Sequence, residues 1–219
     1  YTRLKKDGYT VVVLNPIQTS AMRELFIRKT KTDAKDSFII ADLIRFGRYA
    51  ESNVAQDKLL ALKELCRNRF YLVDMVSDLK RKITALIDRV FPEYETQFDS
   101  IFCKSSMAVL KKYPTPQKIS NAHLSKLTEI LWNSSNGHFG EWKARELKAL
   151  ARGSFGIEDH EGAYSMLIGL MLDQIQSLTE KTGELEKKIA VLLKELDNTI
   201  TSIPGVGPIL GATIVSEIG

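Results

Sequence analysis

Two long stretches of the chain carry apolar residues that recur at alternating intervals of three and four positions. The first series consists of Leu62, Leu65, Arg69, Leu72, Val76, Leu79, Ile83, Leu86 and Val90, and the second of Tyr164, Ile168, Met171, Ile175, Leu178, Thr182, Leu185, Ile189, Leu192 and Leu196. Such a heptad pattern is typical of coiled coils and of long helical hairpins. We therefore expect two long helices that pack on each other within the chain, between chains, or both.

The part of the chain before the first heptad series has a different pattern. Residues Tyr9–Leu14 form a short, almost wholly apolar run, which is typical of a strand buried on both faces of an α/β sheet. Asn15-Pro16 ends this run, and its partner strands are expected to precede Tyr1. Helices are predicted next over residues 17–28 and 31–49. The second of these is apolar around much of its circumference, so we expect it to be well buried.

Short helices are predicted between the two heptad series. Phe91-Pro92 ends the first long helix, because proline cannot continue a helix. Thr115 followed by Pro116 is a typical helix start, with threonine as the N-cap and proline at the first helical position. Gly153 is expected to end a helix over Glu141–Arg152.

Near its end the chain combines two glycines with the start of an apolar helix. The run Ile203-Pro204-Gly205-Val206-Gly207-Pro208 precedes a predicted helix over Ile209–Ile218, in the order found in helix-hairpin-helix motifs. The glycines permit a tight turn, and the N–H groups at a helix N-terminus form a site for phosphate. Gly205, Val206 and Gly207 are therefore candidates for DNA contact that does not depend on sequence. The alternative is a plain helix–helix turn in a bundle.

Composition and charge restrict the class of protein. The chain has 219 residues, a net charge of +4 and a pI of about 8.9, a mild basic excess that suits nucleic acid. Residues 1–48 hold ten Lys/Arg against five Asp/Glu. Cys66 and Cys103 have neither zinc-site spacing nor a disulfide framework, which favours a reducing cytoplasm. No run approaches the roughly 18 apolar residues of a membrane span.

The candidate acids are Asp33 and Asp36, three residues apart in Lys31-Thr32-Asp33-Ala34-Lys35-Asp36. At this spacing two side chains share one face of a helix, and paired carboxylates can bind Mg²⁺. Lys31 and Lys35 flank them and would attract a polyanion. The alternative is that the aspartates cap the helix or complement its dipole.

A second group of candidate residues is basic and lies off the first heptad series. It consists of Arg67, Lys80, Arg81 and Lys82. These side chains are candidates for nucleic-acid contact, and a solvated helix face is the alternative.

Taken together, these motifs resemble the insertion-sequence 110 class of bacterial and archaeal transposases. The residues that carry the resemblance are Asn15-Pro16, Lys31-Thr32-Asp33-Ala34-Lys35-Asp36, Tyr113-Pro114-Thr115-Pro116 and Ile203-Pro204-Gly205-Val206-Gly207-Pro208-Ile209-Leu210-Gly211-Ala212. Their order and separation match along the whole chain.

The resemblance implies a recombinase that acts on double-stranded DNA as a homo-oligomer, guided in some members by an RNA from the same element. It implies a ribonuclease-H-like domain with Asp-Glu-Asp-Asp acids that bind Mg²⁺, of which Asp33 and Asp36 are the last two. The first two acids are expected before Tyr1, and an essential serine nucleophile beyond Gly219. The chain is therefore expected to be the centre of a longer cytoplasmic protein of a bacterium or archaeon, inactive by itself.

The expected fold is mainly α. It begins with the truncated end of the ribonuclease-H-like α/β domain, and continues with long coiled-coil helices and the start of a helix-hairpin-helix. The expected divisions are the end of the catalytic domain (1–50), the first coiled-coil helix (51–100), a helical connector (101–157), the second coiled-coil helix (158–197) and the hairpin (198–219). Two alternative functions remain open: a non-catalytic helical scaffold or nucleic-acid-binding remnant, and a DNA-repair accessory protein that uses the glycine hairpin alone.

Overall fold

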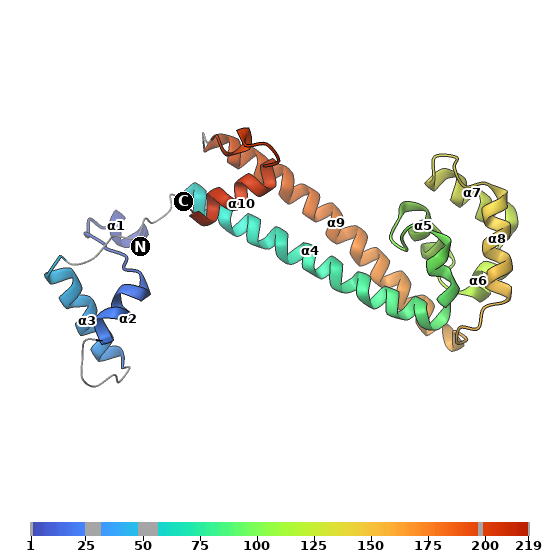
Figure 1. Ribbon diagram of the computed structural model, residues 1–219, viewed down its shortest axis with the longest axis horizontal. Helices are drawn as coiled ribbons and strands as arrows, with labels where there is room; N and C mark the ends of the chain where they lie inside the picture. The colour runs from blue at the N-terminus through green and yellow to red at the C-terminus, as the bar shows by residue number, and fades with distance from the viewer. Residues whose placement is uncertain (1, 25–31, 48–56, 197–198, 219) are drawn as a thin grey trace. The chain divides into compact units, whose positions relative to one another are not determined.

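A computed structural model of the chain describes residues 2–24, 32–47, 57–196 and 199–218 (Figure 1). The chain divides into two compact units, the first formed by Tyr1–Ala61 with Ile214–Gly219 and the second by Leu62–Thr213. Secondary structure in the described residues is helical apart from turns and one isolated bridge at Leu14. The prediction of a mainly α protein is confirmed. None of the helices in these ranges is both long and apolar enough to cross a membrane.

The helices that precede residue 62 are α1 (Thr2–Lys6), α2 (Pro16–Glu24), α3 (Asp33–Arg45) and the first residues of α4 (Asp57–Val90). The elements that follow α4 are η1 (Pro92–Gln97), α5 (Lys104–Lys112), α6 (Pro116–Asn121), α7 (Leu124–Ser134), α8 (Glu141–Arg152), η2 (His160–Gly162), α9 (Ala163–Glu195), η3 (Ile200–Ser202) and α10 (Pro208–Ile218).

The strand predicted over Tyr9–Leu14 is not present. Residues 9–13 have no regular structure, and Leu14 forms only an isolated bridge. A strand needs a neighbour to pair its N–H and C=O groups, and the described residues contain no second strand that could supply it. The end of a ribonuclease-H-like sheet therefore stays a prediction.

Helix α3 is less buried than its composition suggested. Ile39 and Leu43, which lie one turn apart on the same face, are 3% and 4% exposed, and within the first unit this helix packs against α2. Phe38 and Ile44 point away from that face and are 60% and 43% exposed. The expectation of a well-buried helix is wrong, because only one face of α3 is covered.

The second unit is built on the two long helices predicted from the heptad series, α4 and α9, which run antiparallel (Figure 1). They form a hairpin within the chain. Near the open end of this hairpin, Arg69 of α4 donates its Nε–H to Glu186 Oε1 of α9 at 2.9 Å. This pair joins the one charged residue of the first series to the opposite helix and thereby favours one register. The coiled coil itself stays a prediction.

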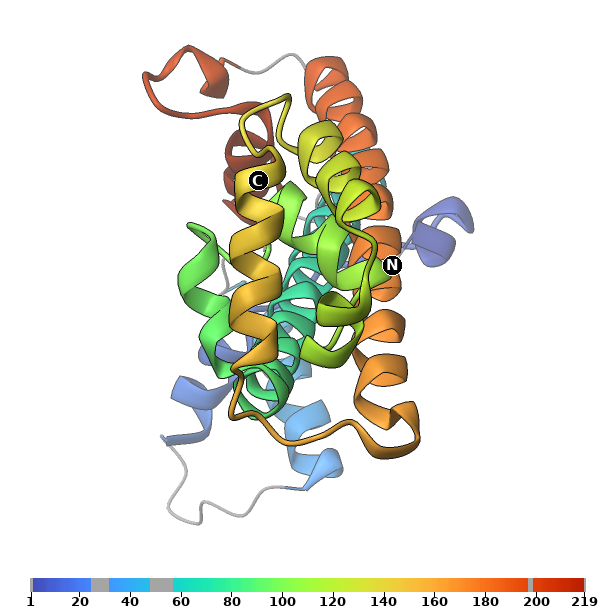
Figure 2. The same cartoon turned by 90° about the vertical axis from the view of Figure 1, so that its right-hand side faces the viewer.

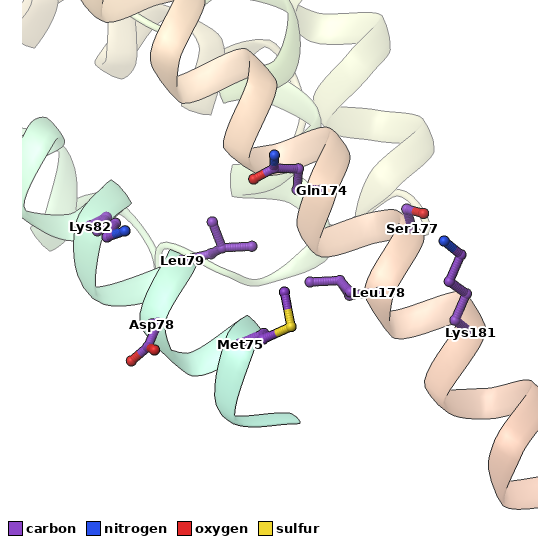
Figure 3. A pocket seen from close by; sticks show the side chains of 8 residues that line it. All are labelled: Met75, Asp78, Leu79, Lys82, Gln174, Ser177, Leu178 and Lys181. Atoms are coloured by element: carbon purple, nitrogen blue, oxygen red, sulfur yellow. The ribbon is translucent and has the colours of Figure 1, made fainter. Parts of the chain in front are cut away.

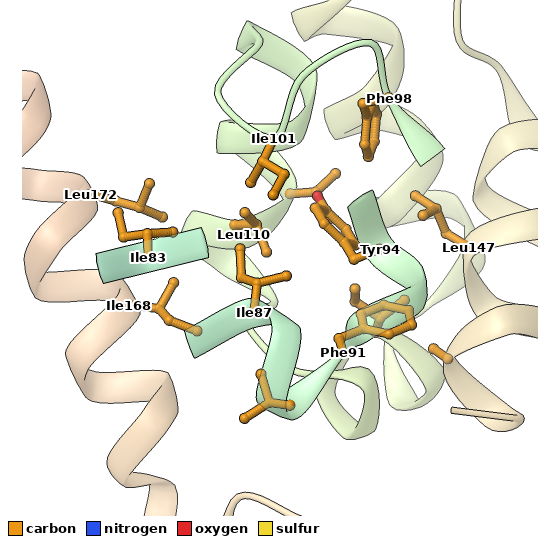
Figure 4. Packing of buried hydrophobic residues seen from close by; sticks show 14 of the residues in the cluster. Ile83, Ile87, Phe91, Tyr94, Phe98, Ile101, Leu110, Leu147, Ile168 and Leu172 are labelled. Atoms are coloured by element: carbon orange, nitrogen blue, oxygen red, sulfur yellow. The ribbon is translucent and has the colours of Figure 1, made fainter. Parts of the chain in front are cut away.

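The main hydrophobic core lies at the other end of the hairpin, where α4 ends and α9 begins, and α5–α8 gather there (Figures 1 and 2). Ile83 and Ile87 of α4 lie beside Ile168 and Leu172 of α9 (Figure 4). Tyr94 is fully buried and donates its hydroxyl to Ser106 O at 3.1 Å, and its burial raises the pKa of the phenol. This core attaches the short helices to the hairpin.

Two carboxylates accept hydrogen bonds that fix the segment between α8 and α9. Glu93 accepts hydrogen bonds from Ser154 Oγ at 2.8 Å and Phe155 N at 3.1 Å. Asp159 accepts from the backbone N–H groups of Tyr164 and Ser165, at 2.8 and 3.0 Å, and so caps α9. Burial alone would raise the pKa of both carboxyls, but the hydrogen bonds outweigh it and lower each pKa. Both groups are therefore held as acceptors at neutral pH.

The segment between α8 and α9 also passes very close to the C-terminal end of α4. Ile157 N donates to Arg89 O at 2.9 Å, which places Gly156 directly against the helix terminus. A Cβ at Gly156 would lie 2.1 Å from Val90 O and 2.4 Å from Val90 C, both backbone atoms. Only glycine permits this approach without movement of the backbone.

We predict that Gly156→Ala lowers the free energy of unfolding by about 1–3 kcal/mol, because the connection must move away from α4. Urea denaturation measures this change. Gly169→Ala is the matched control, since Gly169 is inside α9 and a Cβ there would meet no atom of another element within 4 Å. That substitution should stabilise the protein by about 0.5–1 kcal/mol. Equal effects of the two substitutions would contradict the close approach.

Candidate functional site

The two candidate acids lie in the first turns of α3. Thr32 is the N-cap, with extended backbone angles and a side chain that accepts from Lys35 N at 3.4 Å. Asp33 is the first residue of the helix, and Asp36 follows one turn later. The N-cap position is thus occupied by threonine, while both carboxylates remain near the positive end of the helix dipole. The N-cap itself is therefore not an aspartate, whereas the alternative in which the two aspartates complement the helix dipole agrees with their place in the first turn.

The surroundings of the two carboxylates differ. Asp36 Oδ1 lies 2.6 Å from an NH2 nitrogen of Arg23 in α2, and these side chains are 26% and 22% exposed. The Asp33 side chain is exposed and has no ion-pair partner among the described residues. Lys35 is also exposed, and Lys31 lies outside the residues that the structure describes. One carboxylate is therefore open to solvent, and the other is already paired with a cation.

Asp33 and Asp36 have the chemistry of Mg²⁺ ligands but do not make a complete site. Magnesium takes about six oxygen ligands and keeps several of them as water. In the described ranges no group of three or more His, Cys, Asp or Glu side chains is placed to hold a metal ion. The pair fits as two members of a larger ligand set, with Asp33 more accessible than Asp36.

The candidate basic residues of α4 do not form one continuous patch. Arg67 is exposed and lies 13 residues before Lys80, a rise of about 20 Å along a helix. The Lys80 ammonium lies 5.3 Å from the centre of the Phe102 ring, and Arg81 forms an ion pair with Asp78. Lys82 is exposed. Lys80 and Arg81 therefore line one groove beside Phe102, and Lys82 lines another beside α9. Arg67 lies apart from both.

A groove between α4 and α9 is lined by one lysine from each helix. The groove has a volume of about 430 Å³, and Lys82 and Lys181 lie on its opposite helices (Figure 3). Its apolar part is formed by Met75, Leu79 and Leu178. Lys181 is a basic residue that sequence reasoning did not select, because nothing in its local spacing relates it to Lys82 on a different helix.

The glycine turn adopts the conformation that its sequence indicated. Gly205 has a φ of +86°, in the left-handed region that favours glycine, and Val206 N donates to Ile203 O at 3.0 Å. Helix α10 begins directly after Gly207, so its first N–H groups have no intrahelical acceptors. The turn and the second helix are confirmed. The element before the turn is the three-residue η3, so a complete helix-hairpin-helix motif is not confirmed.

Helix α10 is also held closely to the residues that precede the turn. A Cβ at Gly211 would lie 2.9 Å from Ile200 Cγ2, with Thr201 and Leu193 side chains also within 4 Å. Ala212 is fully buried. The turn that carries Gly205–Gly207 is therefore supported from behind by packing, and Gly205 and Gly207 are exposed to solvent.

A comparison with known protein families matches the first part of the chain. Residues 1–92 match the family described as DEDD_Tnp_IS110 transposase, and this segment includes both candidate acids and the basic residues of α4. The resemblance to the transposases of this insertion-sequence class is therefore confirmed.

Relatives from insertion elements match nearly the whole chain. A 44.8 kDa protein of the insertion element IS116 from Streptomyces clavuligerus is 27% identical over 99% of the chain and 55% of its own length. The mini-circle protein named as the candidate transposase for IS117 from Streptomyces coelicolor is 21% identical, with the same two coverages. A 42 kDa protein of IS900 from Mycobacterium paratuberculosis is 24% identical over 86% of the chain. The chain spans about half the length of the curated relatives it matches.

The structure adds one residue to the candidate acid site that sequence reasoning missed. Arg23 is separated from Asp36 by 13 positions and lies in a different helix. No motif relates the two residues, and the contact arises only because α2 and α3 pack together. The opposite charges of Arg23 and Asp36 were visible in the sequence, but their pairing was not.

Proposed function

We propose that this protein is a DNA transposase that recombines double-stranded DNA, with Asp33 and Asp36 as two of the acids that bind Mg²⁺. The observation that carries the proposal is that the transposase family match over residues 1–92 includes two carboxylates one turn apart at the start of α3. Relatives encoded by insertion elements support the same function.

In this proposal the two aspartates act together as metal ligands. Asp33 and Asp36 supply oxygen ligands from one rigid helix, and Lys35 beside them favours the approach of a polyanion. When bound, Mg²⁺ would stabilise negative charge that develops on a transferring phosphoryl group. The serine nucleophile that the resemblance implies is not assigned to a residue of this chain, and a guide RNA stays a prediction.

DNA contact is proposed for two surfaces of the second unit. The first is the basic side of α4, along and around which Arg67, Lys80, Arg81 and Lys82 are distributed, and Lys181 lies across the groove from Lys82. The second surface is the turn Gly205–Gly207, where the N–H groups at the start of α10 can bind a phosphate. Both would contribute affinity that depends on the phosphate backbone and so on salt.

We predict that Asp33→Asn and Asp36→Asn each reduce recombination of a plasmid substrate by the full-length protein by about a hundredfold or more, the scale on which one electrostatic contact to a transition state acts. Asp42→Asn is the control, because Asp42 lies on the same helix and is paired with Arg45 at 3.3 Å. Circular dichroism checks that all three variants remain folded. Unchanged recombination in the Asp33 and Asp36 variants would exclude the proposed metal role.

For the turn, we predict that Gly205→Glu weakens binding to a random-sequence DNA duplex, because it places a negative charge at the phosphate site. Gly205→Asn is the control, since asparagine tolerates positive φ and adds no charge. Fluorescence anisotropy over a series of salt concentrations should also show affinity falling with salt, with a slope of about −0.9 for each phosphate contacted. Affinity that is insensitive to both Gly205→Glu and salt would rule out this surface.

We also propose that the hairpin of α4 and α9 mediates self-association. Several large apolar side chains of the hairpin are exposed, including Phe70 and Tyr71 of α4 and Val191 of α9. A second hairpin would cover them. We predict a sedimentation coefficient that rises with protein concentration, and a smaller rise for Tyr71→Gln. A single species with the mass of one chain at every concentration would refute the proposal.

A further inference from the structure

The ion pair between Arg23 and Asp36 gives the proposed metal ligand a second cationic partner. An NH2 nitrogen of Arg23 lies 2.6 Å from Asp36 Oδ1, with three quarters of each side chain removed from solvent. Arginine stays protonated at any ordinary pH. Among the ion pairs described for α3, this one joins two different helices, whereas Arg45 and Asp42 lie one turn apart on α3 itself, and the Arg45 side chain is 70% exposed.

Partial burial makes the ion pair between Arg23 and Asp36 stronger than an ion pair exposed to solvent. The Arg45–Asp42 pair contributes less, because the Arg45 side chain is 70% exposed and water screens its charge. In a partly desolvated pair, each charge depends on the other, and loss of one leaves its partner poorly compensated. The Nε atom of Arg23 is buried and has no hydrogen-bond partner in the part of the chain that the structure describes. The side-chain hydrogen bond described for this guanidinium is the one to Asp36 Oδ1.

We propose that Arg23 is the resident counter-ion of Asp36 and competes with the divalent cation for that carboxylate. This proposal rests on the proposed metal-binding function of Asp33 and Asp36. Two cations that share one carboxylate repel each other. A bound metal ion therefore weakens the ion pair between Arg23 and Asp36, and Arg23 lowers the affinity of Asp36 for the metal ion. Asp33 is exposed and forms no ion pair in the described residues, so it is the ligand that can bind first.

The competition also connects metal binding with helix packing. Arg23 lies in α2 and Asp36 in α3, and these two helices pack together in the first unit. Displacement of Arg23 by a metal ion removes a polar link between them. The first unit is thus expected to hold α2 against α3 more firmly without a divalent cation than with one.

The test compares Mn²⁺ binding by the full-length protein and its variants, measured from the electron paramagnetic resonance signal of free Mn²⁺. Arg23→Ala and Arg23→Gln should each bind Mn²⁺ about threefold more tightly or better, as expected when a competing ion pair is removed. Arg45→Ala is the matched control, because it removes the same charge from α3 without touching Asp36. Its affinity should equal that of the unmodified protein.

Asp36→Asn separates failure of this inference from failure of the proposed function. If Asp36→Asn weakens Mn²⁺ binding and both Arg23 variants strengthen it, the competition is supported. If Asp36→Asn weakens binding but the Arg23 variants bind equally or less tightly, Arg23 does not compete, and the metal role of Asp36 stands. If Asp36→Asn has no effect, the metal role fails and the competition with it.

If the Arg23 variants do not fold, a measurement on the unmodified protein still tests the competition. Hydrogen exchange of the amides in α2 should become faster when Mg²⁺ is added, because the link to Asp36 is weakened. Exchange of the α8 amides in the second unit is the internal reference and should not change. Unchanged or slower exchange in α2 would overturn the proposal.

Discussion

Burial of apolar surface between α4 and α9 is the interaction on which the second unit depends. Ile83 and Ile87 meet Ile168 and Leu172 where the hairpin joins the short helices, and all four side chains are almost fully buried. Removal of such side chains from water supplies the main driving force for packing. The attachment of η1 and α5–α8 follows from this contact, because their own apolar residues complete the same cluster.

The charged groups inside this unit are satisfied by their neighbours and have structural roles. Arg69 pairs with Glu186 across the hairpin. Lys143 is buried, lies 3.0 Å from Glu146 Oε2, and faces the rings of Phe98, Phe139 and Trp142. Such pairing makes burial of a charge acceptable. These residues are therefore poor candidates for contact with DNA, in contrast to the exposed Lys82 and Lys181.

The candidate acid site shows how far sequence reasoning reaches. Asp33 and Asp36 could be selected because a three-residue spacing on a helix places two carboxylates on one face, whatever the rest of the fold does. Arg23 could not, because its contact with Asp36 depends on how α2 packs against α3. The same reason applies to Lys181, which lies beside the α4 groove only through the return of the chain in α9.

By itself the sequence determined the local features: the two long helices, the helix end at Phe91-Pro92, the N-cap Thr115 and the left-handed turn at Gly205. Each depends on periodicity or on the backbone preference of one or two residues, so neighbours in the chain are sufficient. Only the tertiary structure decided which apolar faces are covered. Residues 9–13 lack strand pairing, and α3 is buried on one face only, because burial and pairing require partners from elsewhere in the fold.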